Sequence, residues 1–149
     1  MSTSLPDKAG DGITAWPISR DLMGLRDLVF RHGRRAGLSS ERGADLALAV
    51  NEAVTNVLDH ADGHGWVRIW ADDDFLTVDI ADFAGRLTSD ACLVELPPEG
   101  PRGYGLWVMR RLCDEFAITR HNGTSRVRLR MRRTLAVLGR DRIVTSRSE

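Results

Sequence analysis

The sequence contains almost no lysine. Of its 21 lysine and arginine residues only Lys8 is a lysine, and it lies in the polar N-terminal segment. A P-loop needs a lysine after its glycines, and a eukaryotic-type protein kinase needs a strand lysine on the nucleotide phosphates. Both designs are therefore excluded. If this chain binds a nucleotide, backbone N–H groups, a metal ion and arginines must hold the phosphates.

Cysteines and long apolar runs are also scarce. Cys92 and Cys113 stand in no CxxC pattern, which predicts reduced thiols, with Cys113 at a helix core position. No apolar run approaches the ~20 residues that span a bilayer. The first residues, MSTSLPDKAGDG, lack the apolar core of a signal peptide. We therefore expect a cytoplasmic protein without membrane contact.

The charges balance to a formal net charge of zero, so the whole molecule has no strong attraction to nucleic acid. A length of 149 residues fits one domain with a sizeable core. Composition predicts a flexible leader over 1–15, one domain over 16–132 and a basic C-terminal tail over 133–149.

Hydrophobic periodicity predicts an α/β (α+β) fold. Apolar residues recur at helical spacing in three segments and alternate with polar residues in two hairpins. The helices are expected over 20–36, 40–61 and 106–116, and the hairpins over 66–81 and 116–131, with a long loop over 86–102. The alternation gives the sheet one covered face. We therefore predict a two-layer sandwich, in which a mixed, antiparallel-rich sheet carries three helices on one face.

Glu52 and Asn56 are the most informative residues. Their spacing of four puts both on one face of the second helix. A carboxylate there can accept a proton or hold a water molecule, and an amide oxygen one turn away suits Mg²⁺. In the alternative interpretation Glu52 only faces solvent and Asn56 bonds locally.

Two further features of the sequence indicate a binding site. Strand alternation puts Asp82 on the apolar face of its strand, although a loop aspartate that caps a turn would explain it equally. The run Gly103-Tyr104-Gly105 opens the third helix, whose first N–H groups can bind an anion. A tight turn is the alternative there.

These motifs together resemble a known family. Glu52–Asn56 (EAVTN), Asp82 with Gly85, and Gly103–Leu106 (GYGL) look like the N, G1 and G2 boxes of the GHKL ATPases. The best resemblance is to their anti-sigma-factor serine/threonine kinase branch, whose members are single Bergerat-fold domains. It extends from Trp16 to Met131.

The resemblance implies a role for each motif residue. Glu52 would be the general base, Asn56 would bind Mg²⁺ on the ATP phosphates, and Asp82 would accept a hydrogen bond from the adenine amino group. The remaining nucleotide-binding positions would be Gly85, Gly103, Gly105, Leu106 and Thr124. The segment 86–102 would form the ATP lid.

The resemblance also implies partners. Such a kinase would phosphorylate a serine of an anti-anti-sigma (STAS-type) protein, sequester a sigma factor and form a homodimer. One departure concerns the G1 box, where Ala84 and Arg86 replace the glycines of DxGxG. This departure favours the alternative of a non-catalytic GHKL-fold regulator that acts by stoichiometric binding. Residues 1–15 are polar and irregular, so we expect no phosphoacceptor helix there, which disfavours a detached histidine kinase.

The polar face of the sheet has its own pattern. Arg126, Arg128 and Arg130 alternate outward, but Asp79 and the neutral net charge predict a solvated, ion-paired face rather than a nucleic-acid interface. Trp66 and Trp70 lie on the same face. They are either snorkelling side chains on an exposed sheet or part of a partner surface.

Overall fold

The computed structural model describes residues 12–60, 64–83 and 104–133. These residues form three helices and five strands. In chain order they are β1 (Thr14–Pro17), α1 (Leu22–Arg35), α2 (Ser40–His60), β2 (Gly65–Ala71), β3 (Phe75–Asp82), α3 (Tyr104–Leu112), β4 (Glu115–His121) and β5 (Thr124–Arg132).

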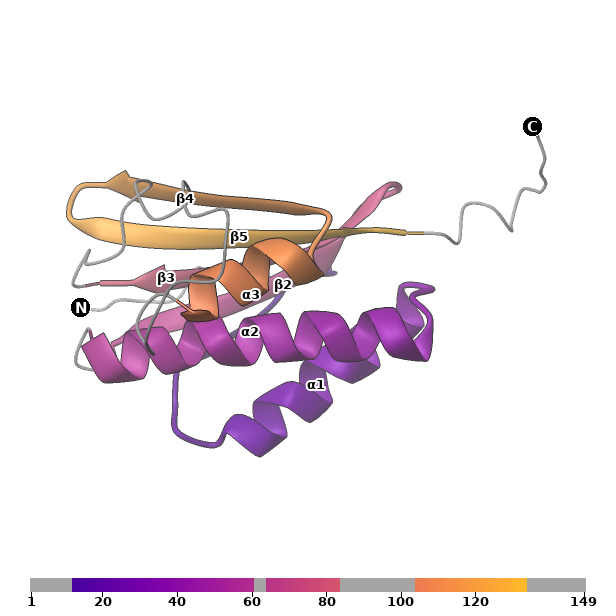
Figure 1. Cartoon of the computed structure of the whole chain (residues 1–149), viewed down its shortest axis with the longest axis horizontal. Coiled ribbons are helices and arrows are strands. Elements are labelled where there is room, and N and C mark those ends of the chain that lie inside the picture. The colour runs from indigo at the N-terminus through magenta and orange to yellow at the C-terminus, as the bar shows by residue number, and fades with distance from the viewer. Residues whose placement is uncertain (1–11, 61–63, 84–103, 134–149) are drawn as a thin grey trace.

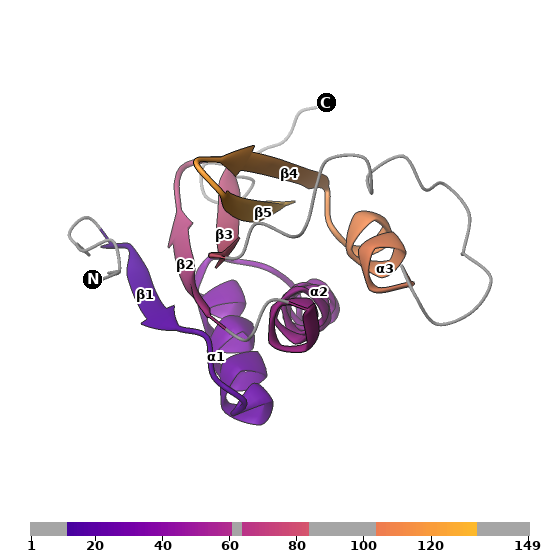
Figure 2. The same cartoon turned by 90° about the vertical axis from the view of Figure 1, so that its left-hand side faces the viewer.

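The strands form one sheet in the order β1-β2-β3-β5-β4, and the four pairings described are all antiparallel. The three helices lie together on one side of this sheet (Figures 1 and 2). Helix α2 packs between α1 and α3 and also contacts β3 and β5. The predicted α+β two-layer sandwich is confirmed.

Alternation along the strands builds the core. The buried apolar residues of β2, β3 and β5 face the helices and meet the apolar stripe of α2. The fully buried members with the largest side chains include Leu46, Ile69, Leu76, Ile80, Met109, Leu129 and Met131. Removing this surface from water stabilises the fold, by about 1.5–3 kcal/mol for each large apolar side chain.

The helix starts follow from local hydrogen bonds. Asp21 caps α1, because its Oδ1 accepts from the Gly24 N–H at 3.0 Å. Ser19 lies one step outside and accepts from the Asp21 N–H at 3.2 Å. At α2 the hydroxyl of Ser39 accepts from the Arg42 N–H at 3.1 Å and caps the helix.

Both predicted hairpins are present, and each is closed by a short turn. Asp72 Oδ1 accepts from the N–H groups of Asp74 and Phe75, each at 2.8 Å, and closes the first turn. These bonds hold the pKa of Asp72 below its usual value. In the second turn Asn122 and Gly123 both have positive φ, which a two-residue type I′ hairpin requires.

The sequence analysis missed β1. This strand has only four residues, begins inside the segment expected as a leader, and ends at Pro17 on the edge of the sheet. The third helix is also shorter than predicted, since Phe116 belongs to β4. The long loop expected over 86–102 lies outside the described residues. Within the described ranges no helix combines the length and hydropathy needed to cross a membrane.

Candidate nucleotide-binding site

Glu52 and Asn56 lie on the flank of α2 that faces α3. The first turn of α2 identifies this flank, because Arg42 donates from Nη2 to Asp114 Oδ2 at 2.5 Å, just beyond the end of α3. Asp45 lies on the same side and helps to raise the pKa of Cys113. Glu52 and Asn56 follow Asp45 by seven and eleven residues, so the helical repeat places them on that flank.

The two helices run in opposite directions, as Figure 1 shows. Arg42 and Asp114 mark one end of their contact. Glu52 follows Arg42 by ten residues, and Tyr104 precedes Asp114 by ten, which is about 15 Å of helix in each case. Glu52 is therefore level with the start of α3, and Asn56 lies about one turn beyond it. Both side chains are half-buried.

Asp82 reaches the same end of the molecule from the sheet. It is the last residue of β3 and only 1% exposed. In the register of the sheet it lies opposite Gly65 on one side and Ser125 on the other. The carboxyl ends of α2 and β3 and the first turn of α3 all lie at this end (Figure 1).

Gly65 and Ser125 were not identified from the sequence. A Cβ on Gly65 would collide with the backbone oxygen of Ala81, so only glycine lets β2 pair closely beside Asp82. Ser125 is fully buried and shares the helix-facing side of the sheet with Asp82. The pairing register between strands is what identifies Gly65 and Ser125 as neighbours of Asp82, and the alternation within a single strand does not.

The structure brings only some of the expected residues together. Gly105 and Leu106 lie in the first turn of α3, where backbone N–H groups have no partner within the helix. Gly85 and Gly103 lie outside the described residues. Thr124 is half-buried at the start of β5, and alternation groups it with Arg126 on the opposite face from Asp82.

Arg42 and Asp114 hold α3 against α2 at the end remote from this site. Asp114 also accepts from the Arg132 N–H at 2.6 Å. Its carboxylate therefore connects the chain just after α3 to both α2 and β5. The bond to Arg42 holds the pKa of Asp114 below its usual value. Next to it, burial raises the pKa of the Cys113 thiol to about 12, which leaves it protonated and unreactive at neutral pH.

The donor set fits a magnesium nucleotide. An amide oxygen and a carboxylate one turn apart are suitable Mg²⁺ ligands or water-orienting groups. A buried carboxylate at a strand end can accept a hydrogen bond from an amino group, and the N-terminus of α3 favours phosphate. None of these functions needs the lysine that the described chain does not contain.

Comparison with known proteins agrees with this geometry. Residues 18–132 match the histidine kinase-like ATPase domain family. The chain is 30% identical to the serine-protein kinase RsbW of Bacillus subtilis (strain 168), and the match spans 61% of this chain and 66% of that relative, just under two thirds of its length.

The fold is also found in a solved structure. A chain in the crystal structure of the SiaB–SiaC complex from Pseudomonas aeruginosa superposes with a TM-score of 0.61 and 16% identity, over 80% of this chain and 88% of that one. At this identity the likeness supports the fold alone. With the family match covering most of its length, this chain belongs to the histidine kinase-like ATPase domain family.

Proposed function

We propose that this domain binds ATP with Mg²⁺ and acts as a protein serine/threonine kinase that regulates a sigma factor. One observation carries the proposal: Glu52 and Asn56 are level with the start of α3, at the end of the molecule where β3 delivers the buried carboxylate of Asp82. The similarity to a serine-protein kinase supports the reaction type.

Each residue then has a chemical task. Asp82 accepts a hydrogen bond from the adenine amino group, and Asn56 supplies an oxygen ligand to Mg²⁺ on the phosphates. The first turn of α3, with Gly105 and Leu106, donates backbone N–H groups to the phosphates, together with Gly85 and Gly103. Thr124 has no assigned contact, since it lies on the opposite face of the sheet from Asp82. Glu52 accepts the proton of the attacking serine hydroxyl, which makes that oxygen nucleophilic.

The partners follow from the same proposal. The phosphoacceptor is a serine on an anti-anti-sigma protein of the STAS type, and the regulated target is a sigma factor bound by a homodimer of this chain. Because transcription takes place in the bacterial cytoplasm, the same compartment is proposed for this protein.

Calorimetric titration with ATP and Mg²⁺ tests the binding site. We expect saturable ATP binding by the wild-type chain and much weaker ATP binding by Asp82→Asn. The matched control is Asp73→Asn, which makes the same change in the exposed β2–β3 turn. Equal ATP affinity in all three proteins would exclude Asp82 from the adenine site.

Transfer from γ-labelled ATP to purified STAS-type proteins of the same genome tests catalysis. Glu52→Gln should reduce the transfer rate at least ~100-fold, as expected for a general base, while the ATP affinity stays within about twofold. Glu41→Gln is the matched control, because Glu41 is an exposed glutamate in the first turn of the same helix. Transfer by Glu52→Gln at the wild-type rate would disprove the assignment.

A non-catalytic regulator is the second candidate. It is favoured by Ala84 and Arg86, which stand where the family's G1 box has glycines. In that case ATP affinity is weak or absent, no phosphate is transferred, and the domain acts by stoichiometric binding of its partner. This alternative would be established by two results: calorimetry that detects no heat of binding up to millimolar ATP, and a stable complex between the chain and a sigma factor.

A further inference from the structure

The sheet face opposite the helices carries a layer of arginine and tryptophan side chains. We call it the arginine–tryptophan layer and define it as Trp66, Arg68, Trp70, Asp79, Arg126 and Arg128. None of the three described helices covers this face (Figures 1 and 2). It lies on the other side of the sheet from Asp82 and the proposed nucleotide site.

Asp79 is the centre of the layer. Although it lies on the outer face of β3, it is 0% exposed. The register places Arg68 of β2 directly on one side and Arg128 of β5 directly on the other. Arg128 binds the carboxylate with two hydrogen bonds, Nε to Oδ1 at 2.7 Å and Nη2 to Oδ2 at 2.8 Å. This bond raises the pKa of Arg128 above its usual value.

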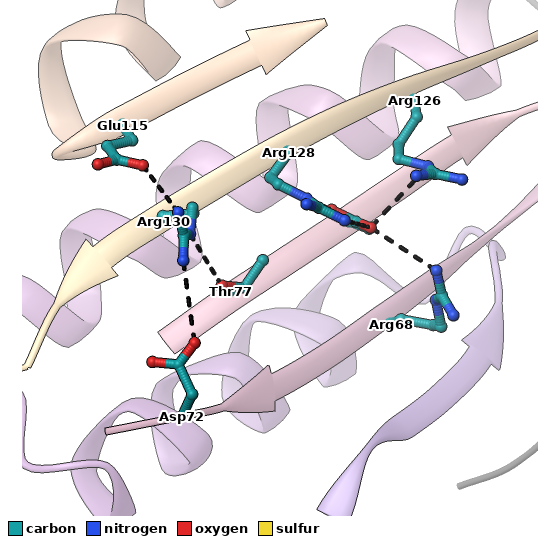
Figure 3. Close-up of polar contacts among 8 residues, drawn as sticks. Arg68, Asp72, Thr77, Glu115, Arg126, Arg128 and Arg130 are labelled. Atoms are coloured by element: carbon teal, nitrogen blue, oxygen red, sulfur yellow. Dashed lines mark hydrogen bonds and ion pairs between the residues drawn. The ribbon is translucent and has the colours of Figure 1, made fainter. Parts of the chain in front are cut away.

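The other two arginines are held less tightly. Arg68 approaches Asp79 Oδ2 to 3.7 Å and Arg126 approaches it to 3.9 Å (Figure 3). Three guanidinium groups thus surround one carboxylate, so positive charges outnumber negative ones among the six residues of the layer. The side chains of Arg126 and Arg128 remain 42% and 40% exposed, so solvent and partners can reach these charges.

The tryptophan rings hold the guanidinium groups in place. Arg68 stacks over Trp66 at 4.5 Å and over Trp70 at 5.7 Å, and Arg128 stacks over Trp70 at 5.4 Å. The arginines therefore have little conformational freedom to lose when a ligand binds. Interfaces use pre-ordered arginine and tryptophan side chains in this way, since binding energy concentrates on them.

We propose that the arginine–tryptophan layer is a docking surface for a protein segment rich in carboxylate side chains. Charge complementarity selects this partner, because carboxylates match the planar, preordered guanidinium groups and neutralise the surplus charge. The adjacent Arg130 is already balanced by Glu115 at 3.0 Å and Asp72 at 3.9 Å, so it adds no unpaired charge to the layer. The proposal does not depend on ATP binding.

Two other occupants fit less well. A second copy that presents the same face would bring two surplus-positive layers together, and like charges repel. Single-stranded nucleic acid binds by stacking its bases on open aromatic rings, but arginines already stack on Trp66 and Trp70.

The test uses the whole chain labelled with ¹⁵N and poly-L-glutamate as the probe. Each of the four tryptophans gives one indole N–H signal, so the spectrum localises binding. At about 50 mM salt, the signals of Trp66 and Trp70 should shift during the titration, while those of Trp16 and Trp107 stay. The shifts should diminish at about 300 mM salt, where the Debye length is shorter.

Arg126→Gln is the informative variant, because Arg126 is half-exposed and only loosely paired with Asp79. We expect its affinity for the probe to fall about twofold to fivefold and that of Arg126→Glu to fall further. The matched control is Arg31→Gln, an exposed arginine on α1 that pairs with Asp27 at 3.3 Å. The control should bind as the wild type does, with melting temperatures compared for all variants.

Three results would overturn the proposal. The first is the absence of any shift of the Trp66 and Trp70 signals at saturating probe. The second is oligothymidylate shifting these signals at lower concentration than polyglutamate, which would assign the layer to nucleic acid. The third is movement of the same signals with protein concentration alone, which would assign it to self-association.

Discussion

Two aspartates on one strand show how differently the two faces of the sheet use a buried carboxylate. Asp79 and Asp82 are three residues apart on β3, and both are at most 1% exposed. Asp79 lies on the outer face between Arg68 and Arg128. Asp82 lies on the helix-facing side, where its neighbours in the register are Gly65 and Ser125.

The difference teaches that burial alone does not identify a functional carboxylate. Asp79 is ion-paired by arginines from both neighbouring strands, so its charge is already used to hold the sheet together. Asp82 has small neighbours and lies at the strand end nearest the start of α3. The same substitution of asparagine for aspartate should therefore lower mainly the stability at Asp79 and mainly the ATP affinity at Asp82.

The largest effect on stability is expected from Asp79→Asn. An amide between three guanidinium groups leaves positive charges without their counter-ion. Removing one partner of a buried ion pair costs 3–5 kcal/mol, and we expect about 3 kcal/mol because solvent reaches the arginines. Urea unfolding measures this loss, and ATP affinity at a temperature where the variant is folded should be unchanged. An unfolding free energy equal to that of Asp73→Asn would contradict the structural role.

Asp82→Asn should show the reverse pattern. We expect the ATP affinity to fall roughly tenfold to a hundredfold, the equivalent of about 1.5–3 kcal/mol for a hydrogen bond to a charged group. Stability should fall less than in Asp79→Asn, because the register partners of Asp82 are the uncharged Gly65 and Ser125, whereas those of Asp79 are two arginines. Calorimetry and urea unfolding on both variants complete the comparison. If both variants lose stability alike and neither loses ATP affinity, the two carboxylates are equivalent and the comparison fails.

Arg128→Lys tests whether the charge of Arg128 or the geometry of its hydrogen bonds stabilises the outer face of the sheet. Lysine keeps the charge but cannot make the two parallel hydrogen bonds to Asp79 or stack on Trp70 in the same way. We expect a loss of about 1–2 kcal/mol in the free energy of unfolding, smaller than for Asp79→Asn. Urea unfolding measures this loss, and it should persist at high salt, because the substitution changes the hydrogen-bond geometry and not the charge. A lysine variant as stable as the wild type would show that charge alone matters there.

The smallest effect is expected from Asp114→Asn. Asp114 forms an ion pair with Arg42, and both side chains are one-third exposed. Its pKa is lowered from 3.8, chiefly by the hydrogen bond from Arg42. The pair therefore stabilises the fold at pH values above 3.8, and this contribution is lost as the pH falls through the lowered pKa. We expect Asp114→Asn to cost less than about 1 kcal/mol at neutral pH and to flatten the decline of stability in acid. Thermal unfolding between neutral pH and pH ~3 checks both, and an unchanged acid profile would contradict the assignment.

Local patterns predicted most of the fold. The hairpin turns at Asp72 and at Asn122-Gly123 depend on side-chain and backbone preferences that act within a few residues. The alternation in β3 and β5 likewise needed no knowledge of the rest of the chain. The first strand was missed because four residues ending in proline carry no recognisable period, and only pairing with β2 orders them.

The candidate site was predicted in part for the same reason. The spacing of Glu52 and Asn56 is a property of one helix, so it is visible in the sequence. Their position relative to the start of α3 depends on the antiparallel packing of α2 and α3 that Arg42 and Asp114 secure. The predicted ion pairing of Asp79 is confirmed, but its complete burial was not foreseen, because that burial results from side chains of two other strands.

By itself, then, the sequence determined the elements, their faces and the motif residues of the histidine kinase-like ATPase family, since these depend on interactions between near neighbours in the chain. The tertiary structure alone decided the strand order, the small neighbours of Asp82 and the burial of Asp79. The physical reason is that these three features arise from contacts between residues far apart in sequence. Such contacts depend on how whole elements pack, and no local pattern of side chains encodes them.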